Sequence, residues 1–383
     1  MAPIIPRVRH GAMTRPHPTP RTPQSVAEVH LRDVAKAFGP TQALDGVELR
    51  VEDGEFFCLL GPSGVGKTTL LRTIAGVERP DRGEVWIGGR DVTHLPPAER
   101  DVAMVFETYA LYPHLTVWEN LAYPLRERRV GPIDIKRRVE RTAELLGITH
   151  TLGRPPQTLS GGEMQRVAVG RAIVREAQVY LFDEPLSHLD AQLREHMRAE
   201  LKRLHREMGS TLIYATPDQL EAMTMPDRVA VLRAGSVAQC DPPLEVYLRP
   251  KRLFVARYVG EPPMNFLDAD LDASGKVKTA AFACRTKARD MVAGACLVGV
   301  RPEDLTVAPT GRPTPPDAVS FAAEVYAVEM CGDYDLVTLT VGADHMTAIA
   351  SDHSTRFATG QTVNVSFASE RLYVIDPVTE RVA

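Results

Sequence analysis

The 383-residue sequence lacks any apolar run that approaches the ~18 consecutive residues needed to cross a bilayer. The first residues also lack the apolar core of a signal peptide. These two absences predict a cytoplasmic protein that would act at a membrane only through a partner.

Paired cysteines and surplus basic charge are missing as well. The five cysteines are scattered without a C-x-x-C pair, which fits a reducing compartment and gives no sign of a structural metal site. The formal net charge of −4 argues against a general nucleic-acid binder, so we expect no nucleic-acid partner. The length exceeds that of one typical hydrophobic core, and we expect two or three domains.

The strongest motif is a glycine loop that fits G-x-x-x-x-G-K-[ST] and lies between a predicted strand at residues 55–60 and a predicted helix at residues 69–75. Glycines let backbone N–H groups turn inward around phosphate oxygens, and a helix N-terminus adds about half a positive charge there. The alternative is a glycine-rich turn that fits the pattern by chance. The motif assigns nucleotide contacts to Gly61, Pro62, Ser63, Gly64, Val65, Gly66, Lys67, Thr68 and Thr69. In it, Lys67 would reach the β- and γ-phosphates and Thr68 would hold Mg²⁺.

A second chemical centre lies at residues 159–166. Ser160 is a good helix N-cap, and Gly161 and Gly162 open the backbone for an anion. A nearby apolar strand, residues 179–182, then runs into Asp183 and Glu184. An aspartate at such a strand end can hold Mg²⁺, and a glutamate beside it can orient or deprotonate an attacking water. The alternative is a pair of solvated loop acids, which the upstream phosphate loop disfavours.

The composition divides the chain into four parts. Residues 1–25 are rich in proline and arginine and predict a disordered tail. Residues 26–240 alternate strands and helices as an α/β domain does, including an amphipathic helix predicted over residues 186–208. Prolines punctuate residues 241–263, which we interpret as a linker. Short β-like runs over residues 264–383 predict a small barrel.

Taken together, these motifs resemble the ATP-binding subunit of ABC transporters, and more closely that of the maltose-type carbohydrate importers. The matching stretches are the signature at residues 159–166, the Walker B segment at 180–185, the D-loop at 187–190, the membrane-partner region at 109–117 and the barrel opening at 299–304. The resemblance implies a P-loop ABC ATPase domain of the α/β class with a helical subdomain, followed by a small OB-like, regulatory C-terminal β-barrel. It also implies ATP and Mg²⁺ as cofactors, with Glu163 in the signature at the nucleotide. Phe38 would stack on adenine, and the alternative for this residue is core packing.

Partners follow from the same resemblance. Two such domains pack head to tail, and each ATP lies between one chain's phosphate loop and the other chain's signature. The chain would therefore need a second ABC ATPase subunit, transmembrane permease subunits and, indirectly, a solute-binding protein. It would sit as a peripheral protein on the cytoplasmic face of the inner membrane and energise uptake of sugars or related polyols.

Two positions depart from the family pattern. Glu107 stands where the family usually has Gln, and Pro217 stands where it usually has the switch His. Glu107 can still ligate Mg²⁺ but adds negative charge beside phosphates. Pro217 has neither a side-chain donor nor a backbone N–H. The chain's own site should therefore hydrolyse ATP slowly, as the weaker half of an asymmetric, non-identical pair.

Two other functions compete with this prediction. A non-hydrolysing regulatory subunit that scaffolds an active partner is favoured by Pro217 and opposed by Glu184. A soluble ABC-type ATPase of translation or DNA repair is disfavoured, because such chains carry two ATP modules or a long coiled coil, and this sequence has neither.

Overall fold

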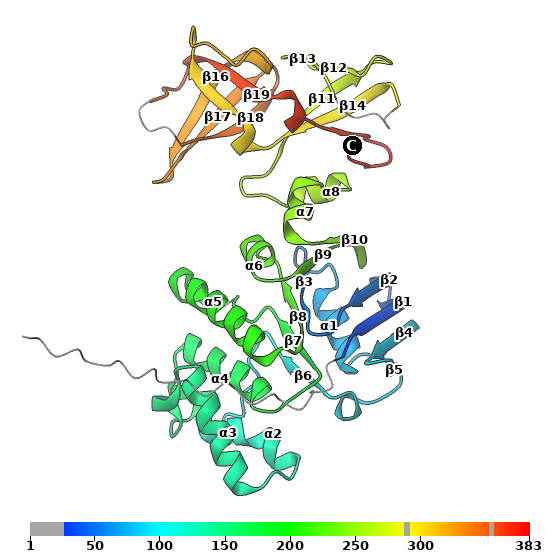
Figure 1. Ribbon diagram of the computed structural model, residues 1–383, viewed down its shortest axis with the longest axis vertical. Helices are drawn as coiled ribbons and strands as arrows, with labels where there is room; N and C mark the ends of the chain where they lie inside the picture. The colour runs from blue at the N-terminus through cyan, green and yellow to red at the C-terminus, as the bar shows by residue number, and fades with distance from the viewer. Residues whose placement is uncertain (1–26, 188, 287–291, 352–355) are drawn as a thin grey trace, which may run out of the picture.

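A computed structural model describes residues 27–187, 189–286, 292–351 and 356–383. The predicted disordered tail, residues 1–25, lies outside the described residues, as does His188 of the D-loop stretch. Figure 1 shows an α/β domain below and a β-rich C-terminal domain above, with helices α7 (Pro243–Leu248) and α8 (Leu253–Tyr258) between them.

The N-terminal domain is built on a six-stranded sheet in the order β10-β9-β3-β8-β7-β6. Its strands are β3 (Phe56–Leu60), β6 (Val102–Val105), β7 (Val179–Asp183), β8 (Thr211–Thr216), β9 (Arg228–Arg233) and β10 (Ser236–Asp241). All pairs are parallel except β9–β10. Every residue of β3 is buried, because alternate side chains enter two different cores on the two faces of the sheet. This explains why the strand before the phosphate loop is a continuous apolar run.

A second, antiparallel sheet in the order β2-β1-β4-β5 covers one face. It consists of β1 (Val29–Phe38), β2 (Thr41–Val51), β4 (Arg82–Ile87) and β5 (Arg90–Asp91). Helix α1 (Lys67–Ala75) belongs to the same core as this sheet, through Leu70, Leu71 and Ile74. The phosphate loop at the start of α1 is therefore held between the two sheets.

Helices cover the other face of the central sheet and form the helical subdomain (Figure 1). They are α2 (Val117–Glu127), α3 (Pro132–Leu145), α4 (Gly161–Ile173), α5 (Ala191–Met208) and α6 (Gln219–Thr224). The predicted helix over residues 186–208 is wrong at its start. Asp190 caps α5 by accepting a hydrogen bond from the Leu193 N–H at 2.9 Å, so Leu186 and Leu189 are buried loop residues that happen to continue the helical spacing.

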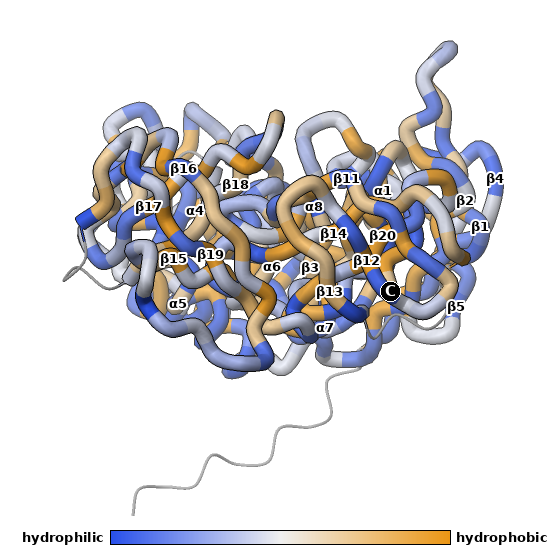
Figure 2. Tube along the Cα trace, turned by 90° about the horizontal axis from the view of Figure 1, so that it is seen from above, coloured by the Kyte–Doolittle hydropathy of each residue, from blue (hydrophilic) through white to orange (hydrophobic). Residues whose placement is uncertain are grey.

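The C-terminal domain contains two five-stranded antiparallel sheets around one apolar core, in the orders β13-β12-β11-β14-β20 and β15-β19-β16-β17-β18. The strands are β11 (Asn265–Leu271), β12 (Lys276–Lys278), β13 (Ala283–Arg285), β14 (Gly294–Val300), β15 (Thr306–Pro309), β16 (Ala318–Met330), β17 (Asp335–Val341), β18 (Asp344–Ala350), β19 (Thr362–Ala368) and β20 (Tyr373–Ile375). Viewed from this end, hydrophobic stretches lie mostly inside and hydrophilic ones on the outer loops (Figure 2). This β-rich architecture confirms the predicted OB-like class.

The stretch predicted to be a linker, residues 241–263, is more ordered than a plain connection. It contains α7 and α8, and its residues Val246, Val255 and Val259 are fully buried in the core of the N-terminal domain. Pro242 and Pro243 do not break these helices, because Pro243 lies in the first helical turn, where a missing N–H costs nothing.

Candidate active site

The phosphate loop holds Lys67 at its centre. The Lys67 ammonium group donates to the carbonyl oxygens of Gly61 at 2.9 Å and Pro62 at 3.1 Å, and it forms an ion pair with Glu184 at 3.2 Å. Only 4% of Lys67 is exposed. A bound phosphate oxygen would meet this ammonium group where it is shielded from water, which strengthens the attraction.

The glycines of the loop allow the backbone to pack closely against neighbouring segments. Gly64 and Gly66 have φ of 81° and 104°, a region that favours glycine. A Cβ atom on Gly66 would lie 2.4 Å from the Ala43 carbonyl oxygen. Gly66 is also the N-cap residue of α1 and provides no side-chain cap for the first N–H groups of that helix. This arrangement fits a phosphate group, which can accept from those N–H groups.

Thr68 and Asp183 come together as the sequence predicts for Mg²⁺. The Thr68 hydroxyl donates to Asp183 Oδ1 at 3.0 Å. Burial raises the pKa of Asp183, and the negative charges of Glu184 and Glu107 raise it further. These oxygen donors suit Mg²⁺, which is usually held by one or two carboxylates together with substrate phosphates. In the described ranges no three His, Cys, Asp or Glu side chains form a ready-made metal cluster.

Glu184 has an unusual backbone for a residue with a side chain. Its φ is 45°, and its N–H donates to the Ala215 carbonyl of the neighbouring strand β8 at 2.9 Å. Residues held in this region cost free energy and concentrate at functional sites. The conformation places the Glu184 carboxylate at Lys67, where it can act as general base for a water attacking the γ-phosphate.

Pro217 lies at the junction of β8 and α6, and we call the residues that join them, 216–219, the switch loop. The Thr216 hydroxyl donates to Glu221 at 2.6 Å, and Asp218 accepts from the Glu221 N–H at 3.0 Å and pairs with Arg194 at 3.4 Å. The polar neighbours of Pro217 are therefore engaged within the loop and with α5. The Pro217 carbonyl oxygen accepts from the Tyr258 hydroxyl at 3.2 Å.

The signature stretch forms the second predicted anion site at the start of α4. Ser160 and Glu163 make a reciprocal capping box, as the sequence indicates for Ser160. The hydrogen bonds from Ser160, and contacts with His150 and Arg154, lower the pKa of Glu163 to about 2. The Glu163 carboxylate thus points back to the cap, while Gly161 and Gly162 begin the helix. Figure 1 places α4 in the helical subdomain, away from α1.

Phe38 stands at the tip of the β1–β2 hairpin, opposite Thr41. It is 47% exposed, with the Lys36 ammonium group 5.4 Å from its ring centroid. This exposure argues against the core-packing alternative and leaves a ring face for stacking on a base.

The predicted membrane-partner stretch, residues 109–117, is partly folded onto the domain. Tyr109 and Leu111 pack against the core, and Arg171 donates to the carbonyls of Ala110 at 2.6 Å and Tyr109 at 3.0 Å. Tyr112 and His114 lie outside the core cluster, and the contact of this stretch with a membrane partner stays a prediction.

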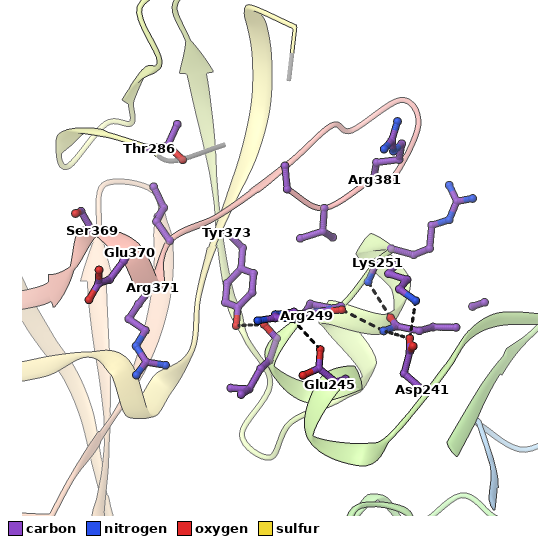
Figure 3. A pocket seen from close by; sticks show the side chains of 18 residues that line it. Asp241, Glu245, Arg249, Lys251, Thr286, Ser369, Glu370, Arg371, Tyr373 and Arg381 are labelled. Carbon is purple, nitrogen blue, oxygen red and sulfur yellow. Dashed lines mark hydrogen bonds and ion pairs between the residues drawn. The ribbon is translucent and has the colours of Figure 1, made fainter. Parts of the chain in front are cut away.

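A cavity of about 1090 Å³ lies elsewhere, between the segment after β10 and the C-terminal domain. Figure 3 shows some of its charged side chains paired with one another, such as Lys251 with Asp241 at 2.7 Å and Arg249 with Glu245 at 3.2 Å. None of the predicted nucleotide, metal or catalytic residues lines it. The candidate active site is therefore the phosphate loop and not this cavity.

Sequence reasoning missed the residues that hold the switch loop, above all Tyr258 and Arg194. Tyr258 is 41 positions from Pro217, and no motif links the two. Arg194 lies in α5, and no motif links it to Asp218.

Comparison with known proteins identifies the family of the chain. The model of the ABC transporter family matches residues 44–187, and that of the TOBE domain matches residues 298–375. The chain is 47% identical to the trehalose/maltose import ATP-binding protein MalK of Thermococcus litoralis, over 92% of this chain and 99% of the relative. It is 45% identical to the sn-glycerol-3-phosphate import ATP-binding protein UgpC of Ruegeria sp., over 94% and 100%.

A third relative is the sulfoquinovosyl glycerol transport ATP-binding protein SmoE of Agrobacterium fabrum, at 42% identity over 93% of this chain and 99% of the relative. Among solved structures, the dimeric post-hydrolysis state of the ATP-binding cassette MJ0796 bound to ADP and phosphate matches with a TM-score of 0.52 and 30% identity. It covers 56% of this chain and 98% of that one.

Proposed function

Since the chain belongs to the ABC transporter family of import ATP-binding subunits, we propose that it is the weaker half of an asymmetric ATPase pair. The pair would energise uptake of a sugar, polyol or related solute. In the described residues no helix is long and apolar enough to cross a membrane. Transport would therefore need permease subunits, which the chain would join at the cytoplasmic face, and a solute-binding protein would act through those permeases.

The chain's own residues suggest how ATP would be handled. Phe38 would stack on the base, Lys67 and the loop N–H groups would hold the phosphates, and Thr68 and Asp183 would ligate Mg²⁺, with Glu107 nearby. Glu184 would accept the proton of the attacking water. Binding would close the pair and hydrolysis would reopen it, which would reset the permease.

The observation that carries the asymmetry is the environment of Pro217. The Pro217 carbonyl faces the Tyr258 hydroxyl, and the polar side chains of its neighbours Thr216 and Asp218 are engaged with Glu221. No imidazole is there to donate to the γ-phosphate or to hold the water. Loss of one transition-state donor typically costs ~10²–10³ in rate. The capped N-terminus of α4, in contrast, keeps the serine and glycines that would complete a partner's site.

The test is to measure ATP hydrolysis by the purified chain alone and together with its co-encoded ATPase. We expect the lone chain to be slow and the mixed pair to be fast, and Pro217→His to accelerate the lone chain. A lone chain that hydrolyses ATP as fast as the pair would refute the asymmetry.

The non-hydrolysing regulatory subunit is the second candidate, and Pro217 favours it. Glu184→Gln separates the two functions. If the chain hydrolyses ATP slowly, Glu184→Gln should remove that residual activity after the partner's own catalytic glutamate has been replaced. If the chain never hydrolyses ATP, this substitution should change nothing.

A further inference from the structure

The segment 258–260, at the end of α8, contacts the switch loop at two points. The Tyr258 hydroxyl donates to the Pro217 carbonyl at 3.2 Å, and the Gly260 N–H donates to Gln219 Oε1 at 2.7 Å. The Tyr258 ring stacks on Phe254, with centroids 5.6 Å apart and planes 5° from parallel. The hydroxyl is therefore aimed by a ring that is itself fixed by packing.

The same segment is held from the other side by the C-terminal domain. Arg301 follows β14 directly and is 1% exposed. Its guanidinium donates to the Val259 carbonyl at 2.9 Å and to the Tyr247 carbonyl, and it lies over the Tyr247 ring at 3.6 Å. Gly260 has φ of 128°, and a Cβ there would lie 2.6 Å from Arg301 Nη1, so the guanidinium is packed against the backbone.

We propose that Tyr258 is a positioning residue for the switch loop, and that Arg301, Val259 and Tyr258 form a direct mechanical link from the C-terminal domain to that loop. Because Val259 lies next to Tyr258, a shift of Arg301 moves the hydroxyl that holds the Pro217 carbonyl. Residue 217 supplies no side-chain donor that could anchor the loop at a phosphate. The contacts at the Pro217 carbonyl and at Gln219 then tie the loop position to the C-terminal domain.

The charged groups around the switch loop make their contacts within the N-terminal domain, so they leave the hydrogen bonds at Pro217 and Gln219 as the link to Arg301. Arg194 of α5 pairs with Asp218, and Glu221 is enclosed by hydroxyl donors from Tyr214 and Thr216. These contacts join the loop only to other parts of the N-terminal domain. The contacts at Pro217 and Gln219 are the ones that lead, through residues 258–260, to Arg301.

The test compares two tyrosine hydroxyls on the full-length chain. Tyr258→Phe keeps the ring and removes the bond to Pro217. Tyr373→Phe is the matched control, because the Tyr373 hydroxyl of the C-terminal domain also donates to a backbone carbonyl, that of Leu248, at 3.0 Å, but away from the switch loop. Hydrogen exchange of residues 214–222 is measured without nucleotide. We expect Tyr258→Phe to speed exchange about 2- to 10-fold, the shift that loss of one neutral hydrogen bond produces, and Tyr373→Phe to leave it unchanged.

The link to the C-terminal domain is tested with Arg301→Lys, which keeps the charge and loses the planar fork. Although Arg301 lies in the C-terminal domain, Arg301→Lys should speed hydrogen exchange of residues 214–222 in the N-terminal domain. This increase in exchange rate should shrink at least by half in the Tyr258→Phe background. Circular dichroism checks that each variant is folded, and the tyrosine pair decides the outcome if Arg301→Lys is not. An undiminished effect of Arg301→Lys in the double variant overturns the link.

A kinetic readout separates positioning from general packing. In the complex with the co-encoded ATPase, whose own catalytic glutamate has been replaced so that only this chain's site turns over, Tyr258→Phe should lower kcat with ATP and leave KM unchanged, and Tyr373→Phe should change neither. Unchanged exchange in Tyr258→Phe, or equal changes in the two variants, overturns the proposal. Only this kinetic arm rests on the proposed function, since the exchange measurement needs no hydrolysis. A fast lone chain would refute the asymmetry while leaving the exchange result intact.

Discussion

Substitutions of the ion-pair partners Lys67 and Glu184 should change the affinity for ATP in opposite directions. Lys67→Ala removes a buried ammonium group that contacts the carbonyls of Gly61 and Pro62 and the Glu184 carboxylate. A hydrogen bond to a charged group contributes about 1.5–3 kcal/mol, so loss of the phosphate contact should weaken ATP binding about 10- to 150-fold. Glu184→Gln instead removes a carboxylate that competes for the same ammonium group and repels the triphosphate. It should tighten ATP binding several-fold and lower any hydrolysis by about 10²–10⁴.

The assay is titration of the isolated chain with Mg²⁺ and ATP, followed by calorimetry or by a fluorescent ATP analogue. The Lys67→Ala value must be corrected for folding, because the substitution leaves Glu184 without its ion-pair partner. A melting curve without nucleotide supplies that correction. If Lys67→Ala and Glu184→Gln shift the Kd in the same direction, the ion pair is not in competition with the phosphates and the reasoning fails.

Three other predictions address separate parts of the chain. Phe38→Ala should weaken ATP binding by about 1–3 kcal/mol, the range for one base stacked on an aromatic ring, while Phe38→Trp preserves it; an unchanged Kd in titrations would restore a structural role for Phe38. The pKa of Glu163 is lowered from 4.5 to about 2, so its contribution to the free energy of unfolding is complete above pH 4.5 and is lost as the pH falls through 2. Glu163→Gln should lower the free energy of unfolding at pH 7 by about 0.5–2 kcal/mol, and denaturation measured at several pH values should show a weaker loss of stability in acid. Removal of residues 264–383 should leave the Kd for ATP unchanged, because every phosphate-contacting residue precedes Gln219; loss of ATP binding by a truncated chain that still folds would contradict this.

The parts of the predicted chemical centre can be located from the sequence because they are local. The phosphate loop follows β3 and opens α1. Asp183 ends β7, which β8 separates from β3 in the parallel sheet, and its carboxylate accepts from Thr68 at the same edge. The capping box at Ser160 and Glu163 is likewise a contact over three residues. Each of these depends on spacing along one element or on the common edge of a parallel sheet.

Other features depend on side chains that meet only after folding. The start of α5 was misplaced because Leu186 and Leu189 continue the helical period, whereas Asp190 determines where the helix begins. The contact of Tyr258 with Pro217 spans 41 positions and that of Arg301 with Val259 spans 42. Periodicity carries no information about such pairs, and prolines near α7 and α8 suggested a linker where short helices pack on the core.

The close packing of Gly66 on Ala43 fixes the distance between the β1–β2 hairpin and the phosphate loop. Ala43 belongs to β2, whose hairpin with β1 carries Phe38, and Gly66 closes the phosphate loop. Gly235 also meets the backbone of residues 43 and 44, where a Cβ would lie 2.8 Å from the Ala43 carbonyl oxygen. Because these approaches are backbone on backbone, no rotamer change at the contact can lengthen or shorten the span between the hairpin backbone and the loop. A ligand engages both ends only if its base and its phosphates are separated by that fixed length, so the hairpin would select nucleotides by their size before any polar group reads the base.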